Sequence, residues 1–518
     1  MARTPLMARL RLLARVAQLS RRSGIPTDEL IELPRRRFLQ AAVGGLAVSA
    51  LAGGASCAST QKGSGGGNGP RVAIVGAGIA GLHCAYLLKQ GGIRAEVYEA
   101  ADRTGGRIFT RDDILNPGQT LEIGGSFIDS THADMLKLCK EFGLPLLDMT
   151  SDKGMKPCAY FFDGRHYSER EVLDALKPYV ERIGADAALM EMEWDKFVKD
   201  PRVAKLDTTG IGEYLDSLGV SGWLRKLLEV AFVTEYGLDA NEQSAFNMLS
   251  LIGLDTGAET WEAFGDSDER YKVKGGNQRV VDELAKRVEE QIETGRKLEG
   301  ISEVAGGYKL AFSGGREVTA DYVVLTLPFT LLREVKLDVK LPAEKTRAIN
   351  ELGYGMNAKL MIGMSKRVWR EQGYGGNIFT DQPFQLAWDN ARLQPGAAGG
   401  ITLYSGGKAA LEVGQGTPKS QVERLLPGLE KAYPGAEWAY TGKLLRMHWP
   451  SHAFTKASYA CYRPGQWTTI AGHEIEPVGN LLFAGEHCSG DFQGYMNGGA
   501  ETGRVAAEAI LAQVGKPK

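Results

Sequence analysis

Three closely spaced glycines have the spacing of a phosphate-binding turn. Gly76, Gly78 and Gly81 fit the pattern GxGxxG between a short apolar run and a helical stretch. Gly76 permits a tight turn, Gly78 lets the backbone approach a pyrophosphate, and Gly81 lets the helix pack against the strand. The backbone at Ile79 and Ala80, in the first turn of that helix, can donate N–H groups to phosphate oxygens. The pattern predicts a dinucleotide site.

A carboxylate closes this βαβ unit at the end of its second predicted strand. Glu99 lies about 20 residues after the last glycine, where an acid can accept hydrogen bonds from both ribose hydroxyls. A glycine turn alone is a weak signal, but its place between strand and helix and the terminal acid make it specific. These features do not distinguish FAD from NAD.

A single lysine stands in a strand that is apolar on both faces. Lys359 lies in the run 358–364, whose other residues are alanine, glycine, leucine, isoleucine and methionine. Such a run is typical of a buried strand, and a buried ammonium group is costly unless it is solvated or partnered. Lys359 is therefore either a functional group or a lysine that reaches solvent from a sheet edge.

The segment after Glu99 is more specific. The run Glu-Ala-Ala-Asp-Arg-Thr-Gly-Gly-Arg, from Glu99 through Ala100 to Arg107, resembles the flavin amine oxidase family of monoamine, polyamine and L-amino-acid oxidases. The resemblance implies FAD as cofactor and implies that Arg107 contacts its phosphates. An arginine suits that position because its planar guanidinium offers several donors to phosphate oxygens.

Further segments resemble the family in the same order along the chain, from about residue 71 to about residue 511. A helix N-terminus beside the flavin pyrimidine edge is physically sensible, since reduced flavin gathers negative charge there. By resemblance, the turn 122–126 lies under the flavin, 274–277 returns the chain to the cofactor domain, 298–301 contacts adenine, and 485–499 forms the C-terminal signature. The cofactor contacts implied there are Gly124, Gly125, Ser126, Leu298, Gly485, Glu486, Tyr495 and Met496.

The resemblance also implies the catalytic groups. In the family, a lysine at the position of Lys359 holds a water against flavin N5, and aromatic rings at the positions of Tyr459 and Tyr495 face each other before the flavin. Two π faces guide an amine by shape or by cation–π attraction. The implied reaction is hydride transfer from an amine to FAD. The imine hydrolyses to a carbonyl compound, and oxygen reoxidises the flavin to give hydrogen peroxide.

Departures from the family pattern refine this prediction. Ser458 stands where some members tether FAD through cysteine, so we expect FAD to be held non-covalently, although Cys461 is close. Phe109 replaces an arginine that pairs with the carboxylate of amino acids in many L-amino-acid oxidases, which favours amines, although Arg111 could substitute. Trp388 and Trp467 are candidate pocket walls, but ordinary core packing is the first interpretation for each.

Several alternatives stay open. The closest is the same chemistry on an L-amino acid, giving a 2-oxo acid and ammonia. Others are a dehydrogenase that passes electrons to a quinone or carrier, a related desaturase, and a flavoprotein without catalytic activity. The last two would have no use for Lys359 and the tyrosine pair.

Composition excludes some classes of partner. With 61 Lys+Arg against 63 Asp+Glu, the formal charge is -2, so nothing favours nucleic acid as a partner. Six scattered cysteines show no zinc spacing, and the histidines form no HExxH pattern, so we predict buried free thiols and no metal.

The pattern of the N-terminal segment predicts an export signal followed by a linker. Arginines at 35–37, then Phe-Leu and an apolar small-residue run, are similar to a twin-arginine signal, whose machinery exports folded proteins. A basic amphipathic helix unrelated to export is the alternative. Cys57 could carry a lipid, and 63–69 is a glycine-rich linker. The expected location is periplasmic or extracellular.

These observations predict an α/β protein of two domains. A Rossmann-type FAD-binding domain is expected from residues 70–135, 270–340 and 475–518. A substrate domain with helices and a mixed sheet is expected from 136–269 and 341–474, and residues 1–69 are expected to lie outside the fold. The oligomeric state is left open.

Overall fold

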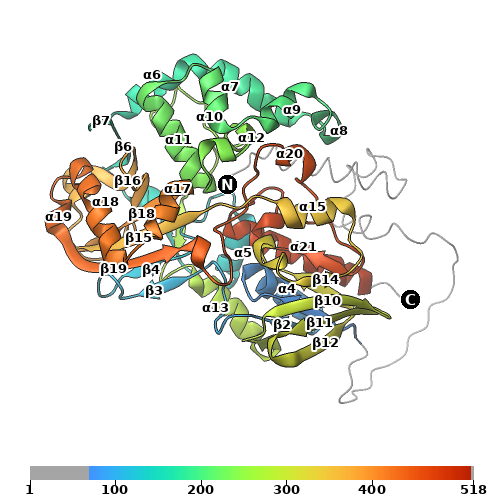
Figure 1. Ribbon diagram of the computed structural model, residues 1–518. Helices are drawn as coiled ribbons and strands as arrows, with labels where there is room; N and C mark the ends of the chain where they lie inside the picture. The colour runs from blue at the N-terminus through green and yellow to red at the C-terminus, as the bar shows by residue number, and fades with distance from the viewer. Residues whose placement is uncertain (1–68, 515–518) are drawn as a thin grey trace.

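A parallel sheet carries the glycine turn. The computed structural model describes residues 69–514, and its first sheet has five parallel strands in the order β20-β13-β1-β2-β9 (Figure 1). Their bounds are β1 Val72–Val75, β2 Ala95–Tyr98, β9 Ile292–Glu293, β13 Tyr322–Leu325 and β20 Leu481–Phe483. The run 72–75 is buried throughout, as a strand covered on both faces requires.

Two helices pack tightly beside this sheet. Helix α4, Ile79–Gln90, follows the glycine turn, and α21, Met496–Val514, crosses it closely. A side chain at Gly503 would bring its Cβ to 2.2 Å from the Ala80 carbonyl oxygen, so glycine is required at this crossing. Helix α13, Gln278–Arg287, also packs against α4.

A mixed four-stranded sheet, in which only β14 runs parallel to its neighbour β10, extends the cofactor domain. Strands β12-β11-β10-β14 form it. Its strands are β10 Leu298–Val304, β11 Gly307–Phe312, β12 Arg316–Ala320 and β14 Lys336–Asp338. The ring of Phe312 lies 4.5 Å from that of Tyr98, centroid to centroid, which joins this sheet to the parallel one.

A seven-stranded mixed sheet forms the second half of the molecule, in the order β19-β15-β18-β17-β16-β6-β7 (Figure 1). Its strands are β6 Lys156–Phe162, β7 Arg165–Tyr167, β15 Asn357–Met364, β16 Tyr374–Thr380, β17 Leu386–Asp389, β18 Gly399–Gly406 and β19 Tyr440–His448. Alternate residues of β6 enter different cores. Tyr160 and Phe162 pack with the helical region, whereas Ala159 and Phe161 pack beneath helices α17, Gly407–Val413, and α18, Pro418–Ala432. The sheet is therefore covered on both faces.

A helical layer covers one face of that sheet and is drawn in green in Figure 1. Its longest helix, α11, ends at Gly237, whose φ of 79° is the left-handed conformation typical of a helix C-terminus. The helices are α6 Glu169–Leu176, α7 Val180–Ala187, α8 Trp194–Phe197, α9 Pro201–Thr208, α10 Ile211–Ser217, α11 Gly222–Tyr236 and α12 Ala245–Leu249.

The remaining helices and strands complete the fold. They are α5 Ala133–Glu141, α14 Phe329–Leu332, α15 Ala343–Glu351, α16 Val368–Glu371, α17 Gly407–Val413, α18 Pro418–Ala432, α19 Ala436–Ala439, α20 Gln466–Thr469, β3 Thr110–Asp112, β4 Thr120–Glu122, β5 Leu146–Asp148 and β8 Tyr271–Val273.

The sheets follow the segments predicted for the two domains, with one exception. Strand β5 lies in a segment assigned to the substrate domain, but it pairs with β8 of the cofactor segments. The exact division stays a prediction, since β5 and β8 join the two parts.

The predicted export signal, with Cys57, lies outside the described residues. Within residues 69–514, no helix combines the length and apolarity needed to cross a membrane. Five cysteines in that range are free thiols, and Cys84, Cys139, Cys461 and Cys488 are buried.

Candidate active site

One cavity of about 740 Å³ runs from the glycine turn to the seven-stranded sheet. Its cofactor end is lined by the turn after β1 and its other end, here called the amine end, by β15, β18 and the loop before β8. Most of the predicted residues meet there: Gly76, Gly78, Ile79, Ala80, Glu99, Ala100, Arg107, Gly124, Gly125, Ser126, Lys359, Trp388, Tyr459, Gly485, Glu486, Tyr495 and Met496.

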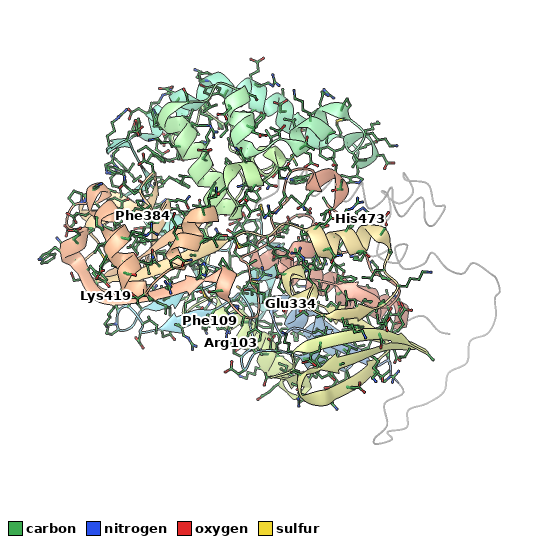
Figure 2. All side chains as sticks on the ribbon, viewed as in Figure 1. Arg103, Phe109, Glu334, Phe384, Lys419 and His473 are labelled. Atoms are coloured by element: carbon green, nitrogen blue, oxygen red, sulfur yellow. The ribbon has the colours of Figure 1, made fainter. Side chains whose placement is uncertain are left out.

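Phe109 does not line this cavity, and its prediction as a pocket wall is wrong. Its half-buried ring lies between two guanidinium groups, with Arg103 Cζ 4.0 Å and Arg111 Cζ 4.7 Å from the ring centroid. Figure 2 shows Arg103 and Phe109 next to each other. Arg111 is exposed and does not line the cavity, so it does not replace the absent carboxylate-binding arginine.

Trp467 and Leu298 also lie away from the cavity. Trp467 is fully buried, and its Nε1 donates to Asn247 Oδ1 at 2.8 Å, so it is a core residue rather than a pocket wall. Leu298 begins β10 and its side chain packs in the core. Gly81 contributes through packing, since a Cβ there would lie 1.9 Å from the Gly76 carbonyl oxygen.

The glycine turn fits a bound diphosphate. Gly76 has a φ of 106°, and a Cβ there would meet Thr326 Oγ1 at 2.3 Å. A Cβ at Gly78 would meet no protein atom within 4 Å, so this position opens onto the cavity. No side chain caps α4, which leaves the first-turn N–H groups at Ile79 and Ala80 to a ligand.

Glu99 holds the loops around the turn. Its Oε2 accepts from Ala77 N at 2.7 Å, and its Oε1 accepts from Ala101 N at 2.9 Å. A carboxylate offers about four acceptor positions, so Glu99 can still accept ribose hydroxyls while it fixes the backbone.

An ion pair links the cofactor end to both predicted tyrosine segments. Arg107 Nη1 donates to Glu486 Oε1 at 2.8 Å and to the Ser458 carbonyl oxygen at 2.6 Å. Glu486 is 6% exposed and also accepts from Gly494 N at 2.7 Å and Ala460 N at 3.3 Å. The pair therefore fixes the backbone next to Tyr459 and next to Tyr495.

Lys359 lies on β15, a strand whose eight residues are all buried. Its Nζ donates to the Gly124 carbonyl oxygen at 2.5 Å and to Ser126 Oγ at 2.9 Å. Strand β15 pairs with β18 on one side and β19 on the other, so the alternative of a lysine at a sheet edge is wrong. Burial lowers the pKa of Lys359 to about 7.

Two buried groups near Lys359 were missed by sequence reasoning. Glu122 accepts from Asn277 N at 2.7 Å and from Thr110 Oγ1 at 2.8 Å, and burial raises its pKa to about 7. Lys272 Nζ lies 4.4 Å from the Phe127 ring centroid, and burial lowers its pKa. Burial has the largest effect on the pKa of Lys359. The charge of Glu122 raises this pKa, and the charge of Lys272 lowers it.

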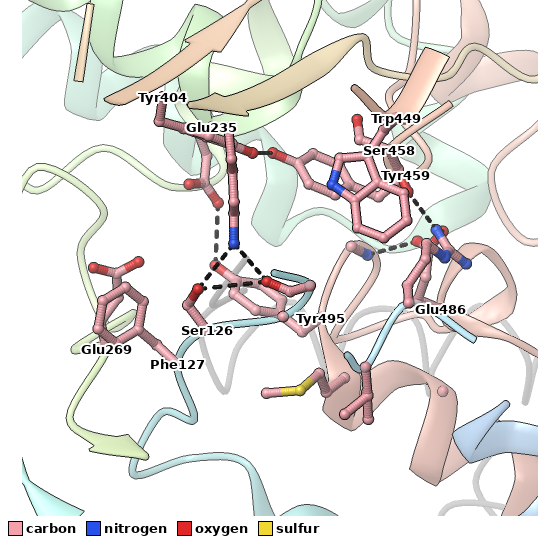
Figure 3. A pocket seen from close by; sticks show the side chains of 18 of the residues that line it. Ser126, Phe127, Glu235, Glu269, Tyr404, Trp449, Ser458, Tyr459, Glu486 and Tyr495 are labelled. Atoms are coloured by element: carbon pink, nitrogen blue, oxygen red, sulfur yellow. Dashed lines mark hydrogen bonds and ion pairs between the residues drawn. The ribbon is translucent and has the colours of Figure 1, made fainter. Parts of the chain in front are cut away.

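The two predicted tyrosines are anchored by separate contacts (Figure 3). Tyr459 and Tyr404 share a hydroxyl–hydroxyl hydrogen bond of 2.9 Å. Tyr495 donates to Glu235 Oε1 at 3.2 Å, and its hydroxyl lies 2.9 Å from Ser267 Oγ. Burial raises the pKa of the Tyr459 phenol, so it stays neutral near pH 7.

Known proteins resemble this chain over most of its length. The profile of the flavin containing amine oxidoreductase family matches residues 79–511. The chain belongs to this family. A flavin-containing amine oxidase of Danio rerio is 21% identical over 456 residues, 86% of each chain, and amine oxidase [flavin-containing] B of Canis lupus familiaris is 24% identical over 466 residues, again 86% of each.

Solved structures share the fold. Cyclohexylamine oxidase from Brevibacterium oxydans IH-35A is 23% identical with a TM-score of 0.75, covering 86% of this chain and 100% of its own. Wild-type putrescine oxidase bound to putrescine is 21% identical with a TM-score of 0.73, covering 86% and 99%. The predicted family and fold class are confirmed, and the chain is an FAD-dependent oxidoreductase acting on amines.

The residues of this amine oxidase fit non-covalent FAD. Ser458, at the position where some members carry the tethering cysteine, donates its hydroxyl to Asn357 Oδ1 at 2.5 Å. Cys461 is fully buried and does not line the cavity, and burial raises the pKa of its thiol. Neither group presents a thiolate to a flavin.

Carboxylates at the amine end of this amine oxidase were not predicted. Asp129, Glu235 and Glu269 all line the cavity. Burial raises the pKa of Glu235 to about 7. Burial, and then the charges of Glu235 and Asp129, raise the pKa of Glu269 to about 8. No spacing in the sequence links these three acids, because they come from three separate segments.

Proposed function

We propose that this amine oxidase converts a small amine without a carboxylate to an imine at Lys359, between Tyr459 and Tyr495. The imine hydrolyses to a carbonyl compound, and oxygen accepts the electrons. One observation carries the proposal: the glycine turn, the buried lysine and both tyrosines line a single cavity. Bound FAD would supply the acceptor for the hydride equivalent from the amine carbon.

The contacts of Lys359 define what its amine can do. A neutral lysine has two N–H groups and one lone pair, and two oxygens, of Gly124 and Ser126, accept from it. Both N–H groups are then used, so the lone pair is left to hold a water or take a proton in the cavity. A pKa of about 7 suits such a group, since general acid–base catalysis is most effective near the operating pH.

The tyrosines orient the amine. Fixing an amine between aromatic faces limits its approach to the flavin and removes water from it. The hydroxyls of Tyr404 and Tyr459 are paired with each other, which keeps these phenol groups in place. The chain thus orients and desolvates the substrate, and no nucleophile is needed.

The cavity does not favour an L-amino acid. Two arginines line its amine end, but each already forms an ion pair within the protein. Arg270 Nη2 lies 2.8 Å from Asp148 Oδ2, and Arg392 Nε lies 2.8 Å from Asp152 Oδ2. Recognition of a substrate carboxylate needs an available guanidinium. In their ionised forms, Glu235 and Glu269 would also repel it. An amine without a carboxylate is therefore the better supported substrate.

Anaerobic reduction of the yellow holoenzyme by a panel of amines and amino acids tests this proposal. Lys359→Met should keep FAD bound and slow the flavin half-reactions about 100-fold, within the usual range for loss of an acid–base group. Lys366→Met, which removes an exposed lysine paired with Glu371, is the matched control. Unchanged kinetics in Lys359→Met would remove the role assigned to Lys359.

We also propose export through the twin-arginine route, supported by arginines 35–37 and the apolar run after them. Fractionation of cells that express the full chain should recover the holoenzyme in the periplasm or medium. Recovery from the cytosol alone would contradict this proposal without affecting the chemistry.

A further inference from the structure

The amine end of the cavity holds more carboxyl groups than oxidation of a single amine requires. Asp129, Glu235 and Glu269 line it, and Figure 3 shows Glu269 on the side opposite Ser458 and Glu486. They come from the loop after β4, the end of α11 and the loop before β8. The tertiary fold therefore gathers acids from three segments around one space.

Two of these acids are fixed by hydrogen bonds. Asp129 Oδ2 accepts from Ser267 Oγ at 2.7 Å, and Asp129 Oδ1 accepts from the backbone N–H of Glu269 at 3.0 Å. Glu235 accepts from Tyr495. Glu235 also lies in the last turn of α11, where the helix dipole disfavours a negative charge. These carboxylates are held in place in an environment that a nearby cation would stabilise.

Glu269 differs from the other two acids because its carboxylate has no direct polar contact within residues 69–514. Its carboxylate accepts no hydrogen bond and makes no ion pair with any of residues 69–514. The residue is half-buried and lines the cavity. A partly desolvated carboxylate without a partner is costly. The arginines nearby, Arg270 and Arg392, are already paired with Asp148 and Asp152. The charge of Lys272 lowers the pKa of Glu269, but burial and the charges of Glu235 and Asp129 raise it by more.

We propose that Glu269, with Glu235 and Asp129, binds the second ammonium group of a diamine substrate while its first amine is oxidised beside Lys359. This inference rests on the proposed function. The reacting amine must lose its proton to give up hydride, whereas the distant amine stays charged and is held by the acids. The apolar wall formed by Phe379, Leu386 and Trp388 would lie along the methylene chain between them.

The test compares three substrates of equal length on the holoenzyme: diaminopentane, pentylamine and aminopentanol, in which a hydroxyl replaces the second amine. The rate of anaerobic flavin reduction divided by the apparent Kd is measured for each. A charge-assisted contact predicts that diaminopentane is favoured by about ten- to a hundredfold over the other two. Glu269→Gln should lower this preference about tenfold or more.

Glu262→Gln is the matched control, because Glu262 lines the same cavity from an exposed position. It should keep the preference for the diamine. Glu269→Asp keeps the charge and should also keep the preference, which separates loss of charge from loss of folding.

Equal rates with diaminopentane and pentylamine, or a preference that survives Glu269→Gln, would overturn the inference and leave amine oxidation intact. If no amine reduces the flavin, the proposed function itself fails.

Discussion

The two ends of the cavity handle charge in opposite ways. At the cofactor end, Glu99 and Glu486 accept from backbone N–H groups, and Glu486 also pairs with Arg107. At the amine end, Glu269 has no partner among residues 69–514, and Glu235 and Asp129 lie close to it. The cofactor end is thus already balanced and offers donors to an anion, while the amine end holds carboxyl groups whose ionised forms a cation would stabilise.

The two ends also differ in which groups of the protein would bind the ligand. The cofactor end consists largely of backbone, with glycines that leave room and a helix start that supplies N–H groups. The amine end consists of side chains on β15, β18, α11 and the loop before β8. A common cofactor can be held by backbone shared across a family, whereas substrate selection depends on side chains that can change singly.

The cofactor end should be most sensitive at Glu486. Glu486→Gln leaves Arg107 without its charge partner and weakens the hydrogen bond to Gly494 N. Breaking a buried pair costs about 3–5 kcal/mol, and we expect the lower end because the Arg107 side chain is a quarter exposed. Thermal release of FAD, followed by flavin fluorescence, should occur at a clearly lower temperature in the variant.

Glu96→Gln is the control, since it removes an acid from an exposed pair with Arg94 and should change stability by no more than about 1 kcal/mol. Equal effects of the two substitutions would show that the cofactor end does not depend on the Arg107–Glu486 pair, and the contrast between the two ends would weaken.

The cofactor end could be predicted from sequence because its signals are local. The spacing of Gly76, Gly78 and Gly81 specifies a turn between adjacent elements, and α4 and β1 form where the apolar pattern predicts them. Lys359 was also found this way, since an ammonium group in a fully apolar strand is conspicuous.

The amine end could not be predicted, because no sequence spacing links Asp129, Glu235 and Glu269. They meet only when the helical layer packs on the seven-stranded sheet. The predictions that Phe109 and Trp467 are pocket walls are wrong for a related reason. An aromatic residue type indicates burial or contact, but not which face of its element meets the cavity. The pairing of β5 with β8, across the predicted domain boundary, likewise depends on tertiary packing.

The smallest effect should appear as a pH dependence of stability at Glu269. Its folded pKa of about 8 lies above the ordinary value of 4.5, so between these values the folded protein holds a proton that the unfolded chain has released. Stability therefore falls as pH rises through this window, and the cost is complete above about pH 8. Glu269→Gln removes the charge and with it this contribution.

The variant should match the wild type below pH 4.5 and become more stable as pH rises to about 8, by about 1–3 kcal/mol, the usual cost of an unsatisfied buried group. The melting temperature of both holoenzymes across this range measures the difference, with Glu262→Gln as the exposed control. Bound diaminopentane should remove the gain, because an ammonium group would then balance the wild-type carboxylate. A pH-independent difference would mean that Glu269 carries no uncompensated charge, and the two ends of the cavity would then be alike.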